Sequence, residues 1–242
     1  MSSLPQHLTT AIEGRAAPLA RADAAYAHLL ENLLEGPLMA GERLSVVALT
    51  ETLNCSRVPV MEAMKRLAGE GFVQIVPQVG CHVVTPRFAD VRDFFVLFAA
   101  VEATVAGFAA ARRNTADVAE FVAVCARVDA GAAQAKGPGE PDPTYRRLNL
   151  LFHSCIHRMA RSPLATGFAR SLWDRSDFYI KLAYGSLYFS QRVRSAHETI
   201  RAAVIAGDPS AAEAAVKAHL LDVGSGVAAR FAPEANENPA SP

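Results

Sequence analysis

Residues 45–67 read SVVALTETLNCSRVPVMEAMKRL and contain two short helical patterns separated by a turn. Apolar residues recur at helical spacing in both halves, as Val46, Leu49 and Leu53 in the first and as Val60, Ala63, Met64 and Leu67 in the second. Ser56 stands where its hydroxyl can accept a backbone N–H of the second helix, and Pro59 falls in the first turn, where a missing N–H is harmless. The stretch is therefore predicted to form a helix-turn-helix.

The face opposite the second apolar stripe is the candidate DNA-binding surface, because the second helix of this motif enters the major groove. Arg57 lies at the start of that helix, where its guanidinium can reach a guanine edge or a phosphate. The other candidates on this face and at its ends are Ser56, Val58, Met61, Lys65 and Arg66. The alternative is that the two amphipathic helices belong to an ordinary helical domain with a polar face.

The segments on either side favour DNA binding. The sequence GEG at 69–71 closes the second helix, and residues 72–76 and 81–84 read as strands joined by PQVG at 77–80. A hairpin here is the wing of a winged helix-turn-helix, and Gly80 joins the candidate DNA-binding residues. Upstream, a helix is expected at about 24–35, ending at Gly36 and Pro37, with an inward stripe of Tyr26, Leu29, Leu30 and Leu33.

These residues resemble the winged helix of the GntR family of bacterial transcription regulators. The resemblance covers roughly residues 22–86 and is carried by LMAGERL at 38–44, CSRVPVMEAMKRL at 55–67, EGFV at 70–73 and PQVG at 77–80. It implies binding to double-stranded DNA. The family usually has arginine where this chain has Met61, and often a small polar residue where it has Val58. The resemblance therefore implies fewer polar base contacts and some contact with thymine methyl groups.

The composition of the 242-residue chain is 51% hydrophobic, which suits one large or two modest domains with a real core. Its 24 basic and 24 acidic residues balance, so DNA affinity must come from a local patch. The four cysteines, at 55, 81, 125 and 155, show no CxxC spacing, which favours reduced thiols over disulfides or a zinc ribbon. Residues 1–20 lack an apolar signal segment, so a cytoplasmic location is expected.

One run, FFVLFAAVEATVAGFAAA at 94–111, is long and apolar enough to be a candidate membrane span. Glu102 lies near its centre, where an acidic residue costs roughly 2.5–3.5 kcal/mol of insertion free energy, and no second span accompanies it. A buried helix of a bundle is the better interpretation, and no membrane partner is expected.

Beyond a boundary near Pro86 and Arg87 the chain reads as helices with short breaks. Helices are expected at 90–113, 115–136, 144–161, 164–184, 190–206 and 209–227, with a loop at 136–143. Gly207, Asp208 and Pro209 supply a C-cap, an N-cap and an N1 residue in succession. The predicted fold is mainly α, with a winged helix-turn-helix at 22–86, an all-α bundle at 87–229, and disordered segments at 1–21 and 230–242.

The bundle resembles the FCD domain, the ligand-sensing domain of the FadR-like branch of the GntR family. The resemblance rests on NLLFH at 149–153, HETI at 197–200, AGD at 206–208 and AHL at 218–220. In that domain a DxxFH motif and two later histidines hold a divalent metal at the base of a cavity for a small organic acid. The resemblance therefore implies a site for a divalent transition metal, zinc or nickel first, formed by Asn149, His153, His197 and His219.

Without the resemblance, a metal site is one of several interpretations. Asn149, His153 and His157 are four residues apart, on one face of a helix, and neutral imidazole is a common ligand of transition metals. Seven histidines in the chain also permit accidental triples, and a histidine on an apolar face is more often hydrogen-bonded in a core. Asn149 provides a neutral oxygen where the family has a carboxylate, so weaker metal binding is expected.

A second departure from the family concerns the effector. The family often has an arginine that can grip a carboxylate one turn before the glutamate matching Glu102, and that position here is Phe98. The candidate ligand-binding residues are therefore Arg146, His157, Tyr179 and Lys181, with Arg147, Arg175, Trp173 and Tyr184 as further possibilities. For each basic residue the alternative is a surface charge, and for each aromatic residue it is a place in the core.

The sequence thus predicts a ligand-responsive, DNA-binding transcription regulator, with repression as the expected sign, that acts as a homodimer on a palindromic operator. A small organic acid or related metabolite is the expected effector. One alternative is a metal-binding protein or small metalloenzyme built on the histidines, and another is an architectural winged-helix protein without an effector. Only Glu198 stands beside the histidines as a possible acid or base, which argues against an enzyme.

Overall fold

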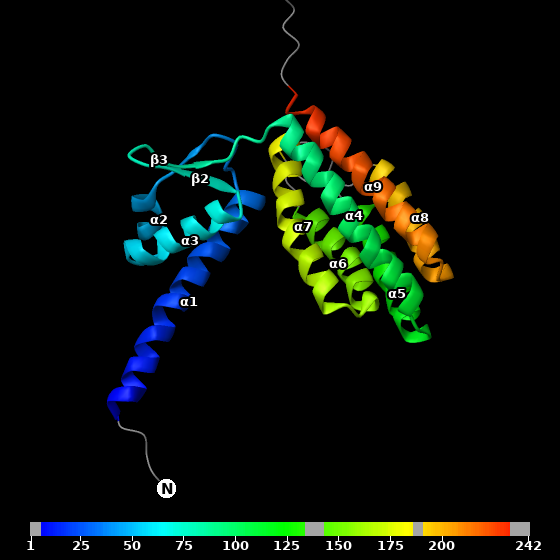
Figure 1. The fold of residues 1–242 in the computed structure, drawn as a ribbon, viewed down its shortest axis with the longest axis horizontal. Helices are drawn as coiled ribbons and strands as arrows, with labels where there is room; N and C mark the ends of the chain where they lie inside the picture. Colours follow the sequence, from blue (N-terminus) through cyan, green and yellow to red (C-terminus); the bar gives the residue numbers. More distant parts are fainter. Residues whose placement is uncertain (1–5, 134–142, 186–190, 233–242) are drawn as a thin grey trace, which may run out of the picture. The chain divides into compact units, whose positions relative to one another are not determined.

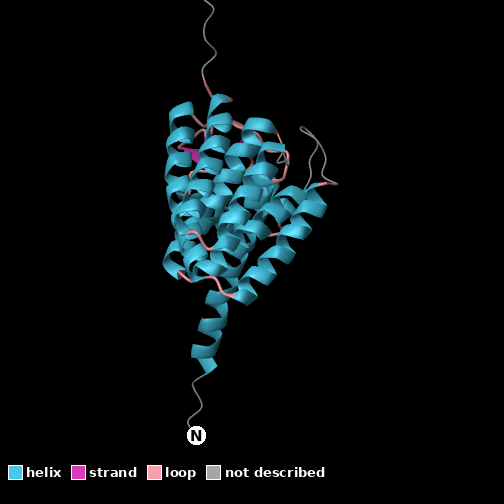
Figure 2. Cartoon of the chain, turned by 90° about the vertical axis from the view of Figure 1, so that its right-hand side faces the viewer, coloured by secondary structure: helices cyan, strands magenta, loops and turns pink. Residues whose placement is uncertain are grey.

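The computed structural model describes residues 6–133, 143–185 and 191–232, and the statements below concern these residues. The chain divides into two compact units, Met1–Thr85 and Pro86–Pro242, where the sequence predicts a boundary near Pro86 and Arg87. Most of the regular structure is helical, with few strands (Figure 2). The predicted mainly α fold is therefore confirmed.

The first unit is a winged helix-turn-helix (Figure 1). Its described elements are α1 (Gln6–Leu34), β1 (Arg43–Leu44), α2 (Val46–Thr52), α3 (Arg57–Gly69), β2 (Val73–Val76) and β3 (Gly80–Val83). The antiparallel sheet has the order β1-β3-β2, with Val73 opposite Val83 and Val76 opposite Gly80. The helices α2 and α3 and the hairpin β2–β3 confirm the prediction, whereas β1 was not predicted.

The caps of the helix-turn-helix follow the sequence in part. Ser45 is the N-cap of α2 and accepts a hydrogen bond from the backbone N of Ala48. Ser56 is the N-cap residue of α3, but its hydroxyl makes no capping hydrogen bond, so that part of the prediction is wrong. The Ser56 side chain is exposed to solvent. The predicted apolar stripe of α3 is buried in full, together with Pro59.

Helix α1 is longer than the sequence predicts. It packs against α3 with Leu29 and Leu33 fully buried, while Tyr26 and Leu30 are half-buried. The helix begins at Gln6 and not near Ala24, so from Gln6 onward the structure has a helix where disorder was predicted for residues 1–21. Alanines recur through residues 11–25, and their high helix propensity favours this extension. Residues 1–5 lie outside the described part of the chain.

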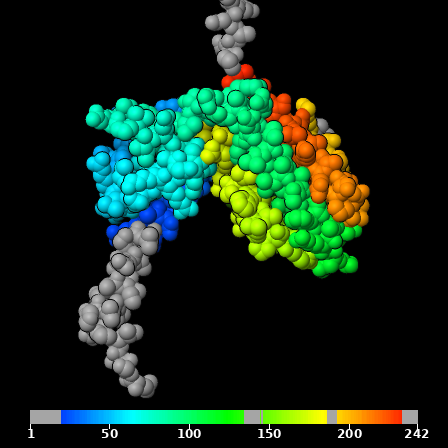
Figure 3. Space-filling model, in the orientation of Figure 1, coloured from blue at the N-terminus to red at the C-terminus, as the bar shows by residue number. Residues whose placement is uncertain are grey.

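The second unit is an all-helical bundle. Its described helices are α4 (Phe88–Arg112), α5 (Thr115–Ala132), α6 (Pro143–Ala160), α7 (Pro163–Tyr184), α8 (Gln191–Ala206) and α9 (Pro209–Ala229). Helix α4 packs against α6, α7, α8 and α9, and α9 lies beside it along the surface (Figures 1 and 3). All six predicted helices are present. The predicted loop at 136–143, apart from Pro143, and the predicted tail from 233 onward lie outside the described residues.

Helix α4 occupies the core of this bundle. By length and composition it is the one helix in the described ranges that could cross a membrane, but 56% of its apolar window is buried within the bundle. Glu102, near the middle of the helix, is only 2% exposed. Burial of this kind is what the core helix of a bundle shows, as the sequence predicts.

The break between α8 and α9 forms as its residues predict. Gly207 has a φ of 71°, Asp208 accepts a hydrogen bond from the backbone N of Ala211 at 3.0 Å, and Pro209 is the first residue of α9. A Cβ atom on Gly207 would stand 1.9–2.0 Å from the guanidinium of Arg113. Glycine is therefore needed here both for the backbone conformation and for the close approach of Arg113.

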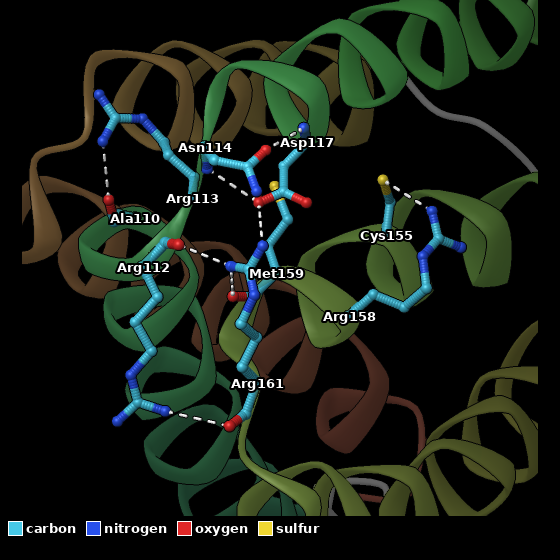
Figure 4. Close-up of polar contacts among 9 residues, drawn as sticks. All are labelled: Ala110, Arg112, Arg113, Asn114, Asp117, Cys155, Arg158, Met159 and Arg161. Carbon is cyan, nitrogen blue, oxygen red and sulfur yellow. Dashed lines mark hydrogen bonds and ion pairs between the residues drawn. The ribbon is translucent and has the colours of Figure 1, made fainter.

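Arginines join the helix ends at one edge of the bundle (Figure 4). Arg161 donates hydrogen bonds to the carbonyl oxygen of Arg112 at 2.6 Å and to Asp117 at 2.6 Å. Arg112 donates in return to the carbonyl oxygen of Ala160 at 2.7 Å. Carbonyl groups in the last turn of a helix lack intrahelical partners, so these cations satisfy the C-terminal ends of α4 and α6.

Candidate metal centre and DNA-binding surface

Three helices of the second unit bring His153 from α6, His197 from α8 and His219 from α9 together. Each offers a ring nitrogen, and these three atoms lie within 4.8 Å of one another. The ring centroids are 5.1 to 6.2 Å apart. All three side chains are buried, with exposed fractions of 1%, 6% and 7%. Nitrogen donors at this spacing from three separate helices can bind one ion.

Asn149 precedes His153 by one turn of α6 and is 7% exposed. The Oδ1 atom of Asn149 and the Nε2 atom of His153 are buried and have no hydrogen-bond partner among the described residues. A buried polar atom without a partner costs roughly 1–3 kcal/mol of stability, so two of them on one helix face indicate a ligand from outside the chain. A donor set of imidazole nitrogens and an amide oxygen fits a divalent transition metal such as zinc or nickel.

Burial favours the neutral form of these imidazoles. Desolvation, with a smaller contribution from the neighbouring histidines, lowers the pKa of His153 and of His197 well below the usual value. Desolvation also lowers the pKa of His219 to about 4. Because a metal binds the unprotonated nitrogen, burial leaves all three side chains in the form that binds metal at neutral pH.

His157 continues the face of Asn149 and His153 but makes its contacts with Glu102 on α4. Its Nε2 atom lies 2.9 and 3.1 Å from the two carboxylate oxygens of Glu102. The indole N–H of Trp173 on α7 donates a hydrogen bond to the same carboxylate at 2.8 Å. The Trp173 ring packs against His153 with 4.3 Å between centroids. Glu102 thus joins His157 to Trp173, whose ring packs against His153 of the histidine cluster.

Phe98, at the position where the family often has an arginine, is part of an aromatic cluster and is fully buried. Its ring centroid lies 5.1 Å from that of Trp173 and 5.7 Å from that of Phe94. Phe94 in turn lies 5.2 Å from Tyr179, whose hydroxyl accepts a hydrogen bond from Arg175 at 2.9 Å. At position 98 the interior face of α4 is therefore apolar, and the polar group that this face presents to Trp173 is the Glu102 carboxylate.

Of the remaining candidate ligand-binding residues, Arg146 belongs to a partly buried charge cluster between α6 and α7. Arg146 donates hydrogen bonds to Asp177 and to Asp174, both at 2.8 Å. Asp177 and Lys181 lie one turn apart on α7, with exposed fractions of 1% and 3%. Lys181 is thus an interior cation, in contrast to Arg147, which is exposed. The last candidate, Tyr184, is 36% exposed, so it does not line an interior pocket.

On α3 the face opposite the buried stripe is open to solvent. Arg57, Val58 and Lys65 are exposed, while Met61 is half-buried. Lys65 forms an ion pair with Glu62 on the helix surface at 2.9 Å. These positions agree with the predicted groove-facing surface.

Arg66 makes contacts within the first unit that the sequence does not predict. Its guanidinium stacks over the ring of Tyr26 at 3.6 Å and forms ion pairs with Asp23 and Glu70. The contacts with Tyr26 and Asp23 attach α3 to α1. The Arg66 side chain is also 51% exposed, so its contribution to the DNA-binding surface stays a prediction.

A cleft of about 510 Å³ lies between α2, the start of α3 and the sheet, and its lining includes Arg43, Arg57 and Gly80. The Nε atom of Arg43 lies 3.2 Å from the place where a Cβ atom on Gly80 would stand, so a side chain at this position would displace the guanidinium. Arg43 was missing from the predicted DNA-binding residues. The motif LMAGERL at 38–44, which places it beside the helix-turn-helix, was the signal that could have identified it.

Comparison with known sequences divides the chain in the same way. The profile described as "Bacterial regulatory proteins, gntR family" matches residues 21–83, and that of the FCD domain matches residues 93–222. The HTH-type transcriptional repressor GlaR of Escherichia coli (strain K12) is 26% identical over 203 residues, which are 81% of this chain and 90% of that protein. The HTH-type transcriptional repressor RspR of the same organism is 26% identical over 204 residues, covering 84% and 86%.

Solved structures share the fold. A GntR transcriptional regulator from Rhodococcus sp. RHA1 is similar with a TM-score of 0.68 at 22% identity, covering 86% of this chain and 97% of that one. McbR/YncC of E. coli has a TM-score of 0.67 at 20% identity, covering 84% and 93%. The family is one of transcription regulators, so the metalloenzyme alternative is not supported. The chain belongs to the GntR family of bacterial transcription regulators, in the branch that carries an FCD ligand-sensing domain.

Proposed function

We propose that this regulator is a cytoplasmic repressor that binds a palindromic operator as a homodimer and senses a small organic acid through a metal held in the bundle. The observation that carries the proposal is the convergence of three buried imidazoles on one point, next to the unpartnered oxygen of Asn149. The relatives GlaR and RspR are both named as repressors, which supports the proposed sign of regulation.

The proposed DNA-binding surface centres on Arg57 at the start of α3. Ser56, Val58, Met61 and Lys65 extend it along the helix, and Arg43 and Gly80 border the adjoining cleft. Between residues 41 and 86 the basic residues Arg43, Arg57, Lys65 and Arg66 are matched by the acidic residues Glu42, Glu51, Glu62 and Glu70. One winged helix with so little net charge should bind DNA weakly, which supports a homodimer that occupies two half-sites.

In the bundle, Asn149, His153, His197 and His219 would hold the metal, with zinc or nickel as the first candidates. The bound ion would supply a fixed positive charge for an acidic effector. Glu102, through its hydrogen bonds with His157 and Trp173, keeps the Trp173 ring against His153 and so restricts the orientation of that imidazole.

The proposed effector site includes Arg146, Tyr179 and Lys181, with His157 as a supporting residue behind it. Lys181 is a buried basic residue of the kind that can pair with a carboxylate, and Arg146 is bound to Asp177, one turn before Lys181 on α7. Phe98 leaves the α4 side without a cation at this position, so α6 and α7 are the elements that would supply the positive charge.

The test is the metal content and thermal stability of the wild type and of His197→Ala, each with and without a chelator. We expect about one ion per wild-type chain and a loss of thermal stability on chelation, because bound metal stabilises the folded state. His197→Ala should bind far less metal and respond little to the chelator. The matched control His28→Ala removes a histidine of the first unit and should behave as the wild type does. Equal metal content and equal chelator response in wild type and His197→Ala would refute the metal site.

A further inference from the structure

The three candidate metal-binding histidines are buried, so an ion needs a route from the surface to them. Such an entry path is as much a requirement of a metal site as its ligands are. In the described part of the bundle, a crevice between α5 and α8 reaches this group. Of the three histidines His197 lines the crevice, and the ring nitrogens of His153 and His219 lie within 4.8 Å of its own.

The crevice is narrow and passes from exposed to buried side chains. At its mouth stand Asp129 of α5 and Glu198 of α8, whose side chains are 64% and 63% exposed. At its floor the buried rings of Phe152 and His197 are stacked, with 4.4 Å between centroids. The free volume is about 10 Å³, which is room for roughly one water molecule. An opening of this size suits a single ion and is too small for an organic molecule.

Arg201 of α8 holds the mouth of the crevice closed. Its guanidinium donates a hydrogen bond to Asp129 at 3.0 Å and forms a second ion pair with Glu198, so that it spans α5 and α8. The Arg201 side chain is only 26% exposed, because it lies within the lining of the crevice. An approaching cation therefore meets the positive charge of Arg201, and the two carboxylates that would attract the cation are already paired.

Resting on the metal site of the proposed function, we propose that this crevice is the route by which a divalent ion enters and leaves the histidine cluster, and that Arg201 controls passage through it. Rotation of the Arg201 side chain away from Asp129 or Glu198 frees carboxylate oxygens for the ion, and His197 is the first imidazole on its way. Ion pairs between exposed groups contribute little stability, so this rotation requires no unfolding of the bundle.

A residue that controls passage has a kinetic signature. Arg201 lies outside the group of side chains that could hold the ion, so its removal should change the rates of binding and release by the same factor. The dissociation constant, which is the ratio of these rates, then stays the same. A residue that supported the bound ion would instead change the dissociation constant.

The experiment measures both rates on the full-length protein. Uptake is followed by stopped flow after mixing chelator-stripped protein with zinc, and release by transferring zinc-loaded protein into an excess of a coloured chelator. Trp173 is the only tryptophan, and its ring centroid lies 4.3 Å from that of His153, so its fluorescence reports on the site. In Arg201→Gln we expect both rates to rise about tenfold, a change that local charge can produce in association rates, and the dissociation constant to stay within about twofold.

Arg158→Gln is the matched control. It removes the same charge and breaks another exposed ion pair with α5, since Arg158 pairs with Glu120 and the two side chains are 54% and 59% exposed. Arg158 lies on α6 outside the lining of the crevice. The control should therefore bind and release zinc at the rates of the wild type.

Wild-type rates in Arg201→Gln, or faster release without faster uptake, would overturn the proposal while leaving the metal site in place. An equal acceleration in Arg158→Gln would overturn it as well. If the wild type binds no zinc at equilibrium, the metal site of the proposed function fails, and the route fails with it. Should circular dichroism show that Arg201→Gln is unfolded, Arg201→Lys takes its place under the same criteria, because lysine keeps the charge but lacks the planar fork that spans two carboxylates.

Discussion

Some side chains of α3 stabilise the fold, and others are exposed on the proposed DNA-binding face. Arg57 is exposed at the helix start, whereas Arg66 is bound to Tyr26, Asp23 and Glu70. Arg57→Ala should weaken specific operator binding by about 1–3 kcal/mol if the contact is bidentate to a base, without a change in stability. Arg66→Ala should instead lower stability, because it removes contacts between α3 and α1. Fluorescence anisotropy on a selected operator, with urea unfolding of both variants, checks this. Unchanged operator affinity in Arg57→Ala would count against the assignment.

Met61 is one of two positions, with Val58, at which α3 differs from the usual pattern of its family. The side chain is half-buried on the groove-facing side of the helix. Met61→Arg should alter the preferred DNA sequence more than the stability of the protein, because arginine adds hydrogen-bond donors that can read a guanine. Selection from a random DNA library by each protein provides the comparison. Recovery of the same sequence by both would mean that position 61 does not face the groove.

The sequence could identify the candidate metal-binding residues but not their surroundings. Asn149 and His153 are neighbours by helical spacing alone, whereas His197 and His219 reach them only through the packing of α8 and α9. The resemblance to the FCD domain supplied these two. The contact of His157 with Glu102 was not predicted. These two residues are 55 positions apart in the chain and lie on different helices, so no spacing rule connects them.

At the scale of helices, the start of α5 is tied to the end of α6. Asp117 accepts hydrogen bonds from the backbone N of Asn114 at 2.8 Å and from Arg161 at 2.6 Å. Burial raises the pKa of Asp117, but the Asn114 bond and the charge of Arg161 together bring it below the usual 3.8. A lowered folded-state pKa contributes stability that is complete above the unfolded-state value and is lost as the pH falls through the folded-state value.

Asp117→Asn should therefore lower the melting temperature at pH 7, and the difference from wild type should shrink as the pH falls below about 3.8. Thermal unfolding followed by circular dichroism between pH 7 and pH 3 measures it. Asp93→Asn, at an exposed aspartate on α4, is the control for a general change in charge. A melting-temperature difference that stays constant over this range would contradict the assigned role of Asp117.

The close packing of α4 and α9 depends on Gly224. A Cβ atom at this position would stand 2.3 Å from the Cβ of Phe95, too near for side-chain rotation to relieve. Gly224→Ala should destabilise the bundle by about 1–3 kcal/mol through overpacking. Gly167→Ala on α7, where no atom lies within 4 Å, should instead be neutral or stabilise by roughly 0.5–1 kcal/mol. Urea unfolding measures the change in the free energy of unfolding for each variant. Equal changes would show that the contact of Gly224 with Phe95 does not determine the packing of α4 and α9.

The elements of the fold were predictable where local signals mark their ends. Proline, glycine and capping residues place the breaks before α7 and α9, and the predicted bounds there agree closely with the structure. Strand β1 was missed because two residues show no alternation, and it exists only through pairing of Arg43 with His82 and Leu44 with Cys81. The extension of α1 to Gln6 was missed because the predicted helix was placed by its apolar stripe from Tyr26 to Leu33, and the alanine-rich segment before it carries no such stripe.

For the whole molecule, we propose that the winged unit, whose residues 41–86 carry four basic and four acidic side chains, needs a second copy for tight DNA binding. We predict a homodimer in solution at micromolar concentration, with loss of half of a palindromic operator weakening binding strongly. Light scattering of the protein alone and of its complex with the full and the half operator measures this. A monomer that retains tight and specific binding to the half operator would contradict it.

We propose that the site around His197 controls how the protein binds DNA. The most direct test is operator affinity, measured by anisotropy, of wild type and His197→Ala under two conditions: with a chelator, and with zinc plus each of a series of small carboxylates beginning with acetate. The account predicts that zinc with a fitting carboxylate shifts the affinity of the wild type at least about fivefold and leaves that of His197→Ala unchanged. If the wild type binds zinc and carboxylate at the histidine cluster while its operator affinity stays constant, the bundle is not a sensor and the account is contradicted.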